Sequence, residues 1–469
     1  MPLDFIAARA QPDGIERLEH VIDVVDAAIL IDAGPGSMRD SDAAWIVEPL
    51  LRHADCLRDL DDWNVIADHL LMHAQSETYV DELMAMPLPL PPADGDGDGA
   101  PMPPTDPEGM ADQFIRWGLQ YELGKIWRNV YRRLESDERV MPFLVQGLVQ
   151  WQPEASHLAC LLLLQLLRVQ THTRDDLDRW YPAAVWRGVL AHIHAYARSR
   201  DHERYVDDVA RLVCEVWDAA AAAAPTRSFS SPRVSDAGAP PSAAPPLSPL
   251  IEALGDAPGP AAAFAQTLLF LLVRAPEPDP ASEAAVVHAV ERLLVHPDIA
   301  PRSGDAGAAA EAPWRTLGAR LIYTNDLGLI CETAMRACRN GVAASLPSPV
   351  TATRVTALAG FGASGGGSRS TLALHDRVGA LADDAARRAA YLGLLPAVWT
   401  AAGARWTRSW QPQTVVAFLQ ELAASADEGC ETRGQDATVA LASARRAKAL
   451  LSAFQAVLDG EDDALASLP

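Results

Sequence analysis

Two overlapping glycine motifs in the last third of the chain are the first candidates for chemistry. Gly360, Gly362 and Gly365 fit the GxGxxG pattern of dinucleotide sites, and residues 362–366 (GASGG) fit the GxSxG pattern of serine hydrolases. A dinucleotide site needs a helix that begins at the third glycine, and a nucleophile elbow needs a strand-to-helix turn beside an acid and a histidine. The chain continues as GGSRS, from which we expect no helix. Neither motif therefore predicts an active site.

Two histidines near the N-terminal end have the spacing of a helical zinc site. His69 and His73 stand four residues apart in HLLMH, so a helix would place both imidazoles on one face. Leu70 stands where HExxH proteins have the general-base glutamate, and the sequence positions no third ligand. We interpret the pair as surface or packed histidines, and the sequence predicts no metal ion.

The cysteines and carboxylates do not indicate catalysis either. No two cysteines form a CxxC pair, and most of them stand among apolar residues, as small core side chains do. Carboxylate clusters such as Asp383 with Asp384 are typical of helix caps and solvated faces. We therefore predict a protein that has no catalytic residues and no cofactor and is not an enzyme. The cysteines are Cys56, Cys160, Cys214, Cys331, Cys338 and Cys430.

The composition excludes several classes of partner. Hydrophobic residues make up 49% of the 469 residues, which is enough to bury a large core. The net charge of −23 makes the surface as a whole repel nucleic acids and anionic lipids, although a local basic patch could serve a protein partner. No basic region followed by a long apolar run opens the chain. We expect a soluble, cytoplasmic protein with no nucleic-acid partner and no membrane insertion.

Helical periodicity recurs along the chain, and no stretch alternates as a β-strand does. Aromatic residues are only 6%, whereas alanine, the best helix former, is abundant. About fifteen short helices with short connections are typical of stacked helices rather than of a compact bundle. We predict an all-α fold, an armadillo- or HEAT-like helical solenoid.

Three segments interrupt the helical pattern. Residues 87–109 and 225–248 are rich in proline, and residues 341–374 are rich in glycine, serine and threonine. Such composition does not continue a helix or supply a core strand, so we predict three long disordered loops. The predicted domains are an N-terminal helical part (1–224), a disordered linker (225–248) and a C-terminal armadillo-like part (249–469).

The proline-rich segments contain PxxP spacings, from Pro89 to Pro92 and from Pro246 to Pro249. SH3 domains bind such polyproline segments. Neither spacing has an arginine or lysine immediately beside it, and proline-rich tracts also act as spacers. Both interpretations, SH3-domain partner and plain spacer, stay open.

Residues 322–341 carry the most informative pattern. Asn325 and Asp326 are placed to cap a helix that begins at Leu327, and Asn340 with Gly341 is a typical stop. Between them an apolar stripe follows the helical repeat and predicts a buried face, while the opposite face carries charge. The stripe is Leu327, Ile330, Cys331, Ala334, Met335 and Cys338, and the charged residues are Glu332, Arg336 and Arg339.

The same segment resembles the signature of a known family. Residues 323–327 (YTNDL), followed by an apolar helix, are similar to the signature of the WISH/DIP/SPIN family. Its metazoan members are called NCK-interacting protein with SH3 domain, and its fungal members are the Dip and Ldb actin-patch proteins. Residues 266–274 (QTLLFLLVR) resemble the family's apolar helix, and residues 388–392 (RAAYL) resemble its Arg-x-x-Tyr-Leu helix. The resemblance extends over residues 264–455.

The chain departs from the family pattern at several points. Gly328 stands where the family usually has lysine, and Glu332 stands where it has aspartate. Residues 341–374 have the character of an insertion. We identify no SH3 domain before the helical region, and therefore expect the fungal form to be the nearer analogue.

The resemblance implies an armadillo-like protein that binds the actin-related protein 2/3 complex. Family members activate that complex without a pre-existing filament, and the unbranched product seeds branched networks at endocytic, cortical actin patches. Such an activator has to bind the active arrangement of the complex more tightly than the inactive one. The alternative is a generic helical-repeat adaptor that binds a peptide or helix of another cytosolic partner.

Two groups of residues are candidates for the site. Arginine and tryptophan dominate interface hot spots, which favours exposed residues of these types, although Trp406 and Trp410 could equally belong to the core. For the signature residues the alternative to partner contact is maintenance of the fold. The candidate contact residues are Glu332, Arg336, Arg339, Arg405, Trp406, Arg408 and Trp410, and the signature residues are Tyr323, Asn325, Asp326, Arg388 and Tyr391.

Overall fold

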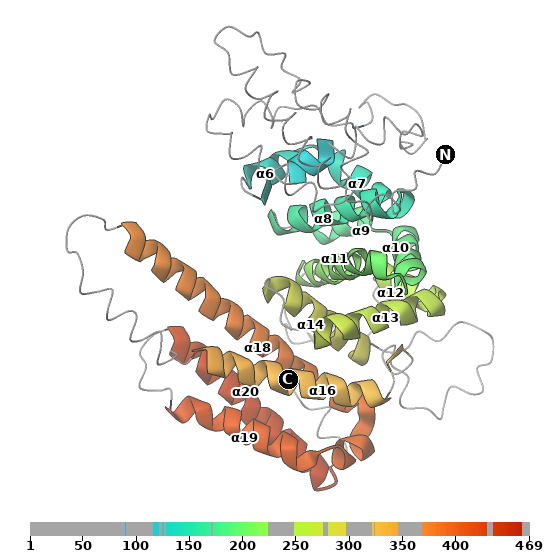
Figure 1. Cartoon of the computed structure of the whole chain (residues 1–469). Helices are drawn as coiled ribbons and strands as arrows, with labels where there is room; N and C mark the ends of the chain where they lie inside the picture. Colours follow the sequence, from blue (N-terminus) through green and yellow to red (C-terminus); the bar gives the residue numbers. More distant parts are fainter. Residues whose placement is uncertain are drawn as a thin grey trace, which may run out of the picture. The chain divides into compact units, whose positions relative to one another are not determined.

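The described residues are almost entirely α-helical, and no β-strand occurs among them. The computed structural model describes residues 90, 116–121, 124–125, 128–169, 172–223, 248–274, 280–296, 321–322, 324–345, 368–428 and 435–461. The predicted all-α fold is therefore confirmed for this part of the chain (Figure 1). Almost all of the predicted loops 87–109 and 225–248 lies outside it, and the solenoid arrangement of the whole chain stays a prediction.

The helices divide into two compact units. Unit 1 consists of Met1–His192, Arg198–Leu212 and Ala223–Pro232, and unit 2 consists of Ile193–Ala197, Val213–Ala222 and Arg233–Pro469. The division thus runs through two helices, whereas the sequence led us to place it at residues 225–248. One reason is an ion pair of 2.6 Å between Asp218, near the end of the helix Glu203–Ala222, and Arg292. This contact ties the end of that helix to unit 2.

Unit 1 is built from helices that pack on their neighbours in the chain. Helix α8 packs against α6 and α7, and α7 also contacts α9. The core contains stacked aromatic rings, with Trp117 on Phe143 and Tyr181 on Trp186. The elements assigned wholly or partly to unit 1 are α6 (Asn129–Ser136), α7 (Val140–Gln150), α8 (Pro153–Val169), α9 (Arg174–Trp180), α10 (Ala183–Tyr196), the short 3-10 helix η1 (Arg200–His202) and α11 (Glu203–Ala222).

Unit 2 is organised around one long helix. Helix α18 packs against α14, α16 and α20, and α19 packs against α20. The rings of Trp399 and Phe454, both fully buried, meet between α18 and α20 at 4.7 Å between centroids. The described helices are α12 (Pro249–Asp256), α13 (Pro258–Val273), α14 (Pro280–Val295), α16 (Thr324–Ser345), α18 (Ser368–Ser409), α19 (Pro412–Glu428) and α20 (Gln435–Leu458).

Helix α16 is longer at both ends than the sequence led us to predict. It begins at Thr324, so Asn325 and Asp326 lie in its first turn instead of capping it. It continues through Asn340 and Gly341 to Ser345, because the residues that follow, VAAS, are compatible with a helix. Asn340 and Gly341 therefore do not end the helix, although the sequence predicted that they would.

Helix α18 also differs from the prediction. It begins at Ser368, inside the segment predicted as a loop and directly after the glycine motifs, so our expectation that no helix starts there was wrong. Its first turns, STLALHD, are rich in leucine and alanine, which favour helix strongly enough to outweigh the glycines before them. Gly403, at φ 80°, breaks the helical geometry between Ser368 and Ser409.

No single described helix is both long enough and apolar enough to cross a membrane. Helices α12 and α13 meet that criterion only when they are taken together, and they are bent by 115° at the break between them.

Candidate partner-binding surface

Helix α16 separates an apolar face from a charged face. The six residues of the predicted stripe, from Leu327 to Cys338, are buried. On the other side Glu332, Arg336 and Arg339 are exposed, and Leu329 is 38% exposed. The predicted division of this helix into a buried stripe and a charged outer face is therefore confirmed.

Trp410, at the end of α18, lies directly against the backbone of α16. A Cβ atom on Gly328 would lie 2.8 Å from Nε1 of Trp410, which is closer than side chains normally approach. Trp406 stacks on Trp410 with ring centroids 5.3 Å apart and an interplanar angle of 8°. Both indoles are partly exposed, so they are neither buried in the core nor fully exposed to solvent.

A second contact joins the same corner to the charged face of α16. Nε2 of Gln411 donates a hydrogen bond of 3.3 Å to Oε1 of Glu332. Gln411 has a φ of 39°, in the left-handed region that non-glycine residues rarely adopt. Its carbonyl accepts hydrogen bonds from the first turn of α19, including one of 3.0 Å from the Thr414 amide. The strained corner between α18 and α19 is thereby held against α16.

Arg339 is held in place by α19. Its Nε donates to Oε2 of Glu421 at 3.2 Å, and its guanidinium lies 5.4 Å from the centre of the Phe418 ring. The side chains of Arg339 and Glu421 are 46% and 64% exposed, so this ion pair is screened by water and worth little by itself. Stacking on a buried ring adds to the orientation of the guanidinium.

Arg336 differs from Arg339 in having no partner among the described residues. It is exposed on the outer face of α16, one turn from Glu332 and in the same part of the helix as Arg339. A positive charge that no described residue neutralises is available to another molecule.

The remaining two arginines of the prediction behave differently. NH1 of Arg408 donates a hydrogen bond of 3.4 Å to the carbonyl of Val457, near the C-terminus of α20, where a cation is favourable. Arg408 thus supports the fold of unit 2 and is not assigned to the surface. The side chain of Arg405 lies outside the described residues.

We define the α16 surface as the exposed or partly exposed residues that these contacts bring together. It combines an exposed aliphatic side chain, two stacked indoles and a mixture of charges. Its members are Leu329, Glu332, Arg336, Arg339, Trp406 and Trp410.

No family model, no curated protein and no solved structure matches the chain. The chemistry of the α16 surface therefore has to be judged from its own residues. Arginine and tryptophan together at a partly exposed position are the commonest anchors of protein–protein interfaces. Nothing in the surface resembles a constellation of nucleophile, base and oxyanion donor.

The signature residues that the structure describes support the fold. The hydroxyl of Tyr391 donates a hydrogen bond of 2.8 Å to Oε1 of Glu283, and Arg387 pairs with the other carboxylate oxygen at 2.9 Å. Burial, and the negative charge of Glu283, raise the pKa of Tyr391. Tyr391 is only 3% exposed, so it cannot contact a partner in this state. It joins α14 to α18.

The other signature residues are described less completely. The backbone carbonyl of Arg388 accepts a weak hydrogen bond of 3.9 Å from Sγ of Cys338, so this residue also lies where α16 meets α18. Asp326 is partly exposed in the first turn of α16, where a carboxylate is favourable. Tyr323 and the side chain of Asn325 lie outside the described residues.

The four described cysteines are buried free thiols. Burial raises the pKa of Cys331 to about 12 and that of Cys338 to about 12. A thiol with such a pKa is protonated at neutral pH and is a poor nucleophile. Cys56 and Cys430 lie outside the described residues.

Sequence reasoning missed a set of polar contacts in unit 1. Nε2 of His157 lies 2.8 Å from Oδ2 of Asp208, whose other oxygen accepts a hydrogen bond of 2.7 Å from Arg211. His192 contacts the Tyr205 hydroxyl at 2.7 Å and the Val149 carbonyl at 3.0 Å. These contacts join α8 and α10 to α11, and α7 to α10. The partners stand far apart in sequence, and no local spacing indicates them.

The motifs that suggested chemistry fall outside the described residues. This holds for His69 and His73, and for the glycines between Gly360 and Gly366. Within the described ranges no group of three or more histidine, cysteine, aspartate or glutamate side chains could hold a metal ion. The PxxP spacing from Pro89 to Pro92 also lies outside, apart from Leu90, whereas Pro249 is the first residue of α12 and is thus helical.

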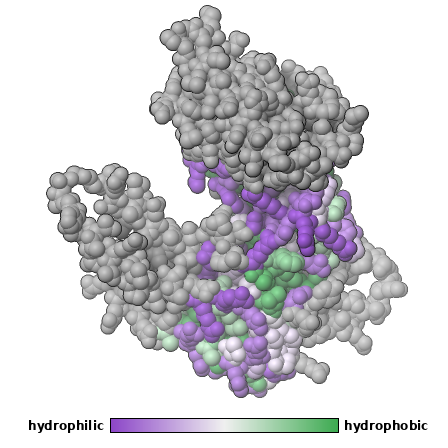
Figure 2. All heavy atoms as spheres, viewed as in Figure 1, coloured by the Kyte–Doolittle hydropathy of each residue, from purple (hydrophilic) through white to green (hydrophobic). Residues whose placement is uncertain are grey.

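Exposed apolar residues also occur on the neighbouring helices of unit 2. Phe270 of α13 is 69% exposed, and Val295 of α14 is 53% exposed. Figure 2 shows hydrophobic residues gathered over this part of unit 2 and bordered by hydrophilic ones. Among the described residues, no charged group or neighbouring segment indicates which molecule would bind over Phe270 and Val295. We therefore assign no partner to these exposed apolar residues.

Proposed function

We propose that the chain is a non-catalytic protein that binds the actin-related protein 2/3 complex through the α16 surface and activates it without a pre-existing filament. The observation that carries the proposal is the position of Arg336. It is exposed and unpaired within the described part of the chain, and it shares its helix face with Leu329 and Arg339. An unneutralised arginine next to apolar anchors is typical of protein-binding sites.

The resemblance of residues 322–341 and 388–392 to the WISH/DIP/SPIN signature supports the choice of partner. These segments form α16 and part of α18, the helices on which the surface is built. By the same resemblance we propose a cytoplasmic location at cortical actin patches. SH3-domain proteins that bind the proline-rich segments remain a second proposed class of partner.

Activation requires more than binding. The chain has to bind the active arrangement of the complex more tightly than the inactive arrangement, because a ligand with equal affinity for both does not change the equilibrium between them. The positions of Arg339 and Trp410 are set by contacts within unit 2, so little ordering of these side chains is needed when a partner binds.

The test is a pyrene-actin assembly assay with purified chain, actin-related protein 2/3 complex and monomeric actin, without a WASP-type activator. We expect faster assembly with the chain than without it. The double variant Arg336→Glu with Arg339→Glu should lose most of this acceleration while its circular dichroism and thermal midpoint stay close to wild type.

The matched control is Arg174→Glu with Arg179→Glu, which makes the same change of charge on α9 of unit 1 and should leave the acceleration intact. No acceleration by the wild-type chain would refute activation. Binding to the complex in a pull-down without acceleration would favour the adaptor function instead. Equal loss in both double variants would remove the α16 surface from the proposal.

A further inference from the structure

Helix α6 of unit 1 presents a basic face in a strongly acidic chain. Residues 124–134 (GKIWRNVYRRL) contain four cations and no carboxylate, although the net charge of the chain is −23. Arg128, Arg132 and Arg133 are all exposed. The positive charge of this segment is opposite in sign to the net charge of the chain, so the overall composition does not explain it.

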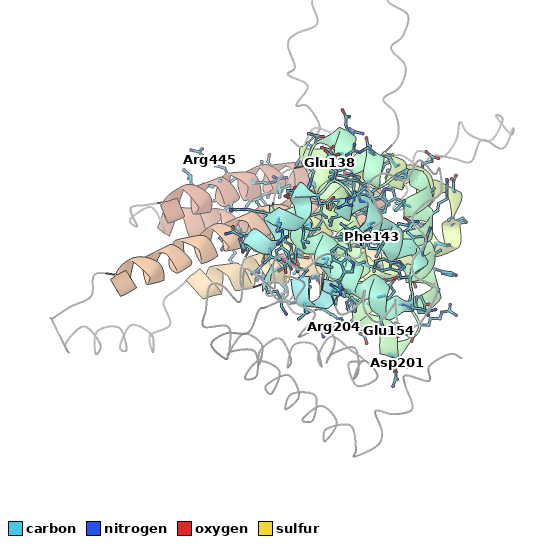
Figure 3. All side chains as sticks on the ribbon, turned by 90° about the horizontal axis from the view of Figure 1, so that it is seen from above. Glu138, Phe143, Glu154, Asp201, Arg204 and Arg445 are labelled. Atoms are coloured by element: carbon cyan, nitrogen blue, oxygen red, sulfur yellow. The ribbon has the colours of Figure 1, made fainter. Side chains whose placement is uncertain are left out.

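The opposite side of α6 fixes the direction of these arginines. Val130, Tyr131 and Leu134 are buried against the rest of unit 1, and the Tyr131 hydroxyl donates a hydrogen bond of 2.7 Å to the Tyr121 carbonyl. The arginines therefore extend away from the core. In the view of Figure 3, Glu138 of the turn after α6 lies at the edge of unit 1, and Phe143 of α7 lies further in.

The three arginines have no carboxylate partner among the residues that the structure describes. Only Arg132 has a side-chain contact there, a long hydrogen bond of 3.4 Å to Asn129. Arg139 shows the alternative, because its guanidinium meets Asp137 at 2.9 and 2.6 Å. Like charges at i and i+4, such as Arg128 and Arg132, destabilise a helix. Arg133 lies in the last turn of α6, where a cation is favourable, but no described carboxylate of unit 1 offsets the repulsion between Arg128 and Arg132.

We propose that this basic face, defined as Arg128, Arg132 and Arg133, binds a short acidic segment of a partner protein. Guanidinium groups bind carboxylates in bidentate pairs, which favours aspartate and glutamate as the groups recognised. The site lies in unit 1 and is separate from the α16 surface of unit 2, so it extends the proposed function with a second contact.

The small size of the basic face favours a short acidic peptide over a long polyanion as its ligand. From Arg128 to Arg133 the helix rises about 7–8 Å, which is also about the distance over which charges interact at physiological ionic strength. A peptide with a few carboxylates fits within that distance. A nucleic acid or an anionic membrane would extend beyond it and meet the negative potential of the rest of the chain.

The experiment measures the fluorescence anisotropy of a fluorescein-labelled peptide, four repeats of Asp-Glu, titrated with the full chain at low and at physiological ionic strength. A peptide of four Asn-Gln repeats is the uncharged control. We expect binding of the acidic peptide only, weakened by salt. The triple variant Arg128→Glu, Arg132→Glu and Arg133→Glu should bind about ten-fold or more weakly, since three ion pairs become repulsive.

A second triple variant, Arg198→Glu with Arg200→Glu and Arg445→Glu, makes the same change in net charge at scattered exposed arginines and should stay within about two-fold of wild type. Circular dichroism checks that both variants fold. Equal weakening in both would mean that net charge alone attracts the peptide and would overturn the proposal.

A single-stranded oligodeoxynucleotide and vesicles containing phosphatidylserine are titrated in parallel. Tighter binding of either one, dependent on the same three arginines, would also overturn the proposal. The actin-assembly assay reports on unit 2 separately, so a chain can fail one test and pass the other.

Discussion

The indole nitrogen of Trp410 lies 2.8 Å from the point where a Cβ atom on Gly328 would stand. Glycine at this position lets the end of α18 lie directly on the backbone of α16. The family that the segment resembles has lysine here, and a lysine in this chain would displace the indole. The glycine at this position thus has a packing reason within unit 2.

Replacing Gly328 with leucine should destabilise the chain. The new side chain would occupy the space of the Trp410 indole, and overpacking of this kind costs about 1–3 kcal/mol. The measurement is the free energy of unfolding in urea, with tryptophan fluorescence as the signal. Gly255→Leu on α12 is the matched control, because a Cβ atom there meets nothing within 4 Å. Equal effects in both variants would contradict the contact.

Removing the hydroxyl of Tyr391 should lower stability by about 1–3 kcal/mol, because Tyr391→Phe leaves Oε1 of the buried Glu283 without this donor. Tyr181→Phe is the control. The Tyr181 hydroxyl is buried and has no hydrogen-bond partner in the described structure, so its removal should be neutral or stabilising. Chemical denaturation of both variants tests this contrast, and a larger loss for Tyr181→Phe would refute it.

Stability should fall as the pH is lowered through the titration of His192. Burial lowers the pKa of His192 below its ordinary value of 6.5, against a smaller opposing effect of the Val149 carbonyl. The unfolded chain therefore takes up a proton near pH 6.5 while the folded chain does not, and the unfolding free energy drops from there down to the lowered pKa.

His192→Gln should reduce the slope of the unfolding free energy against pH below about pH 6.5. His194→Gln changes an exposed histidine of the same helix and is the control for the substitution itself. Urea unfolding between pH 5 and pH 8 measures all three proteins. A slope that His192→Gln does not alter would mean that His192 titrates alike in both states.

The thiols of Cys331 and Cys338 should resist alkylation in the folded chain. Burial raises the pKa of each to about 12, so the thiolate fraction at pH 8 is about 1000-fold below that of an ordinary thiol. Iodoacetamide labelling followed by mass spectrometry of the peptides measures the rate, and urea should restore fast reaction. Fast labelling without denaturant would show that α16 separates from α18.

Much of α16 could be predicted from residues close together in sequence. The spacing of Leu327, Ile330 and the residues that follow indicates a buried stripe, because the helical repeat is a local property of the backbone. The helix ends were predicted less well. Asn340 and Gly341 form a stop signal in isolation, but the chain stays helical past them. The start of α18 at Ser368 was missed because we gave the glycines before it more weight than the helix-favouring leucine and alanine after it.

The sequence alone determined that the chain is helical, that it is acidic, and that one face of α16 carries Glu332, Arg336 and Arg339. These are consequences of composition and of periodicity. Only the tertiary structure decided that Trp410 joins that face, that Arg408 turns to α20, and that Tyr391 binds Glu283 within the core. Such contacts join residues that are distant in the chain, and they follow from packing, which no local pattern encodes.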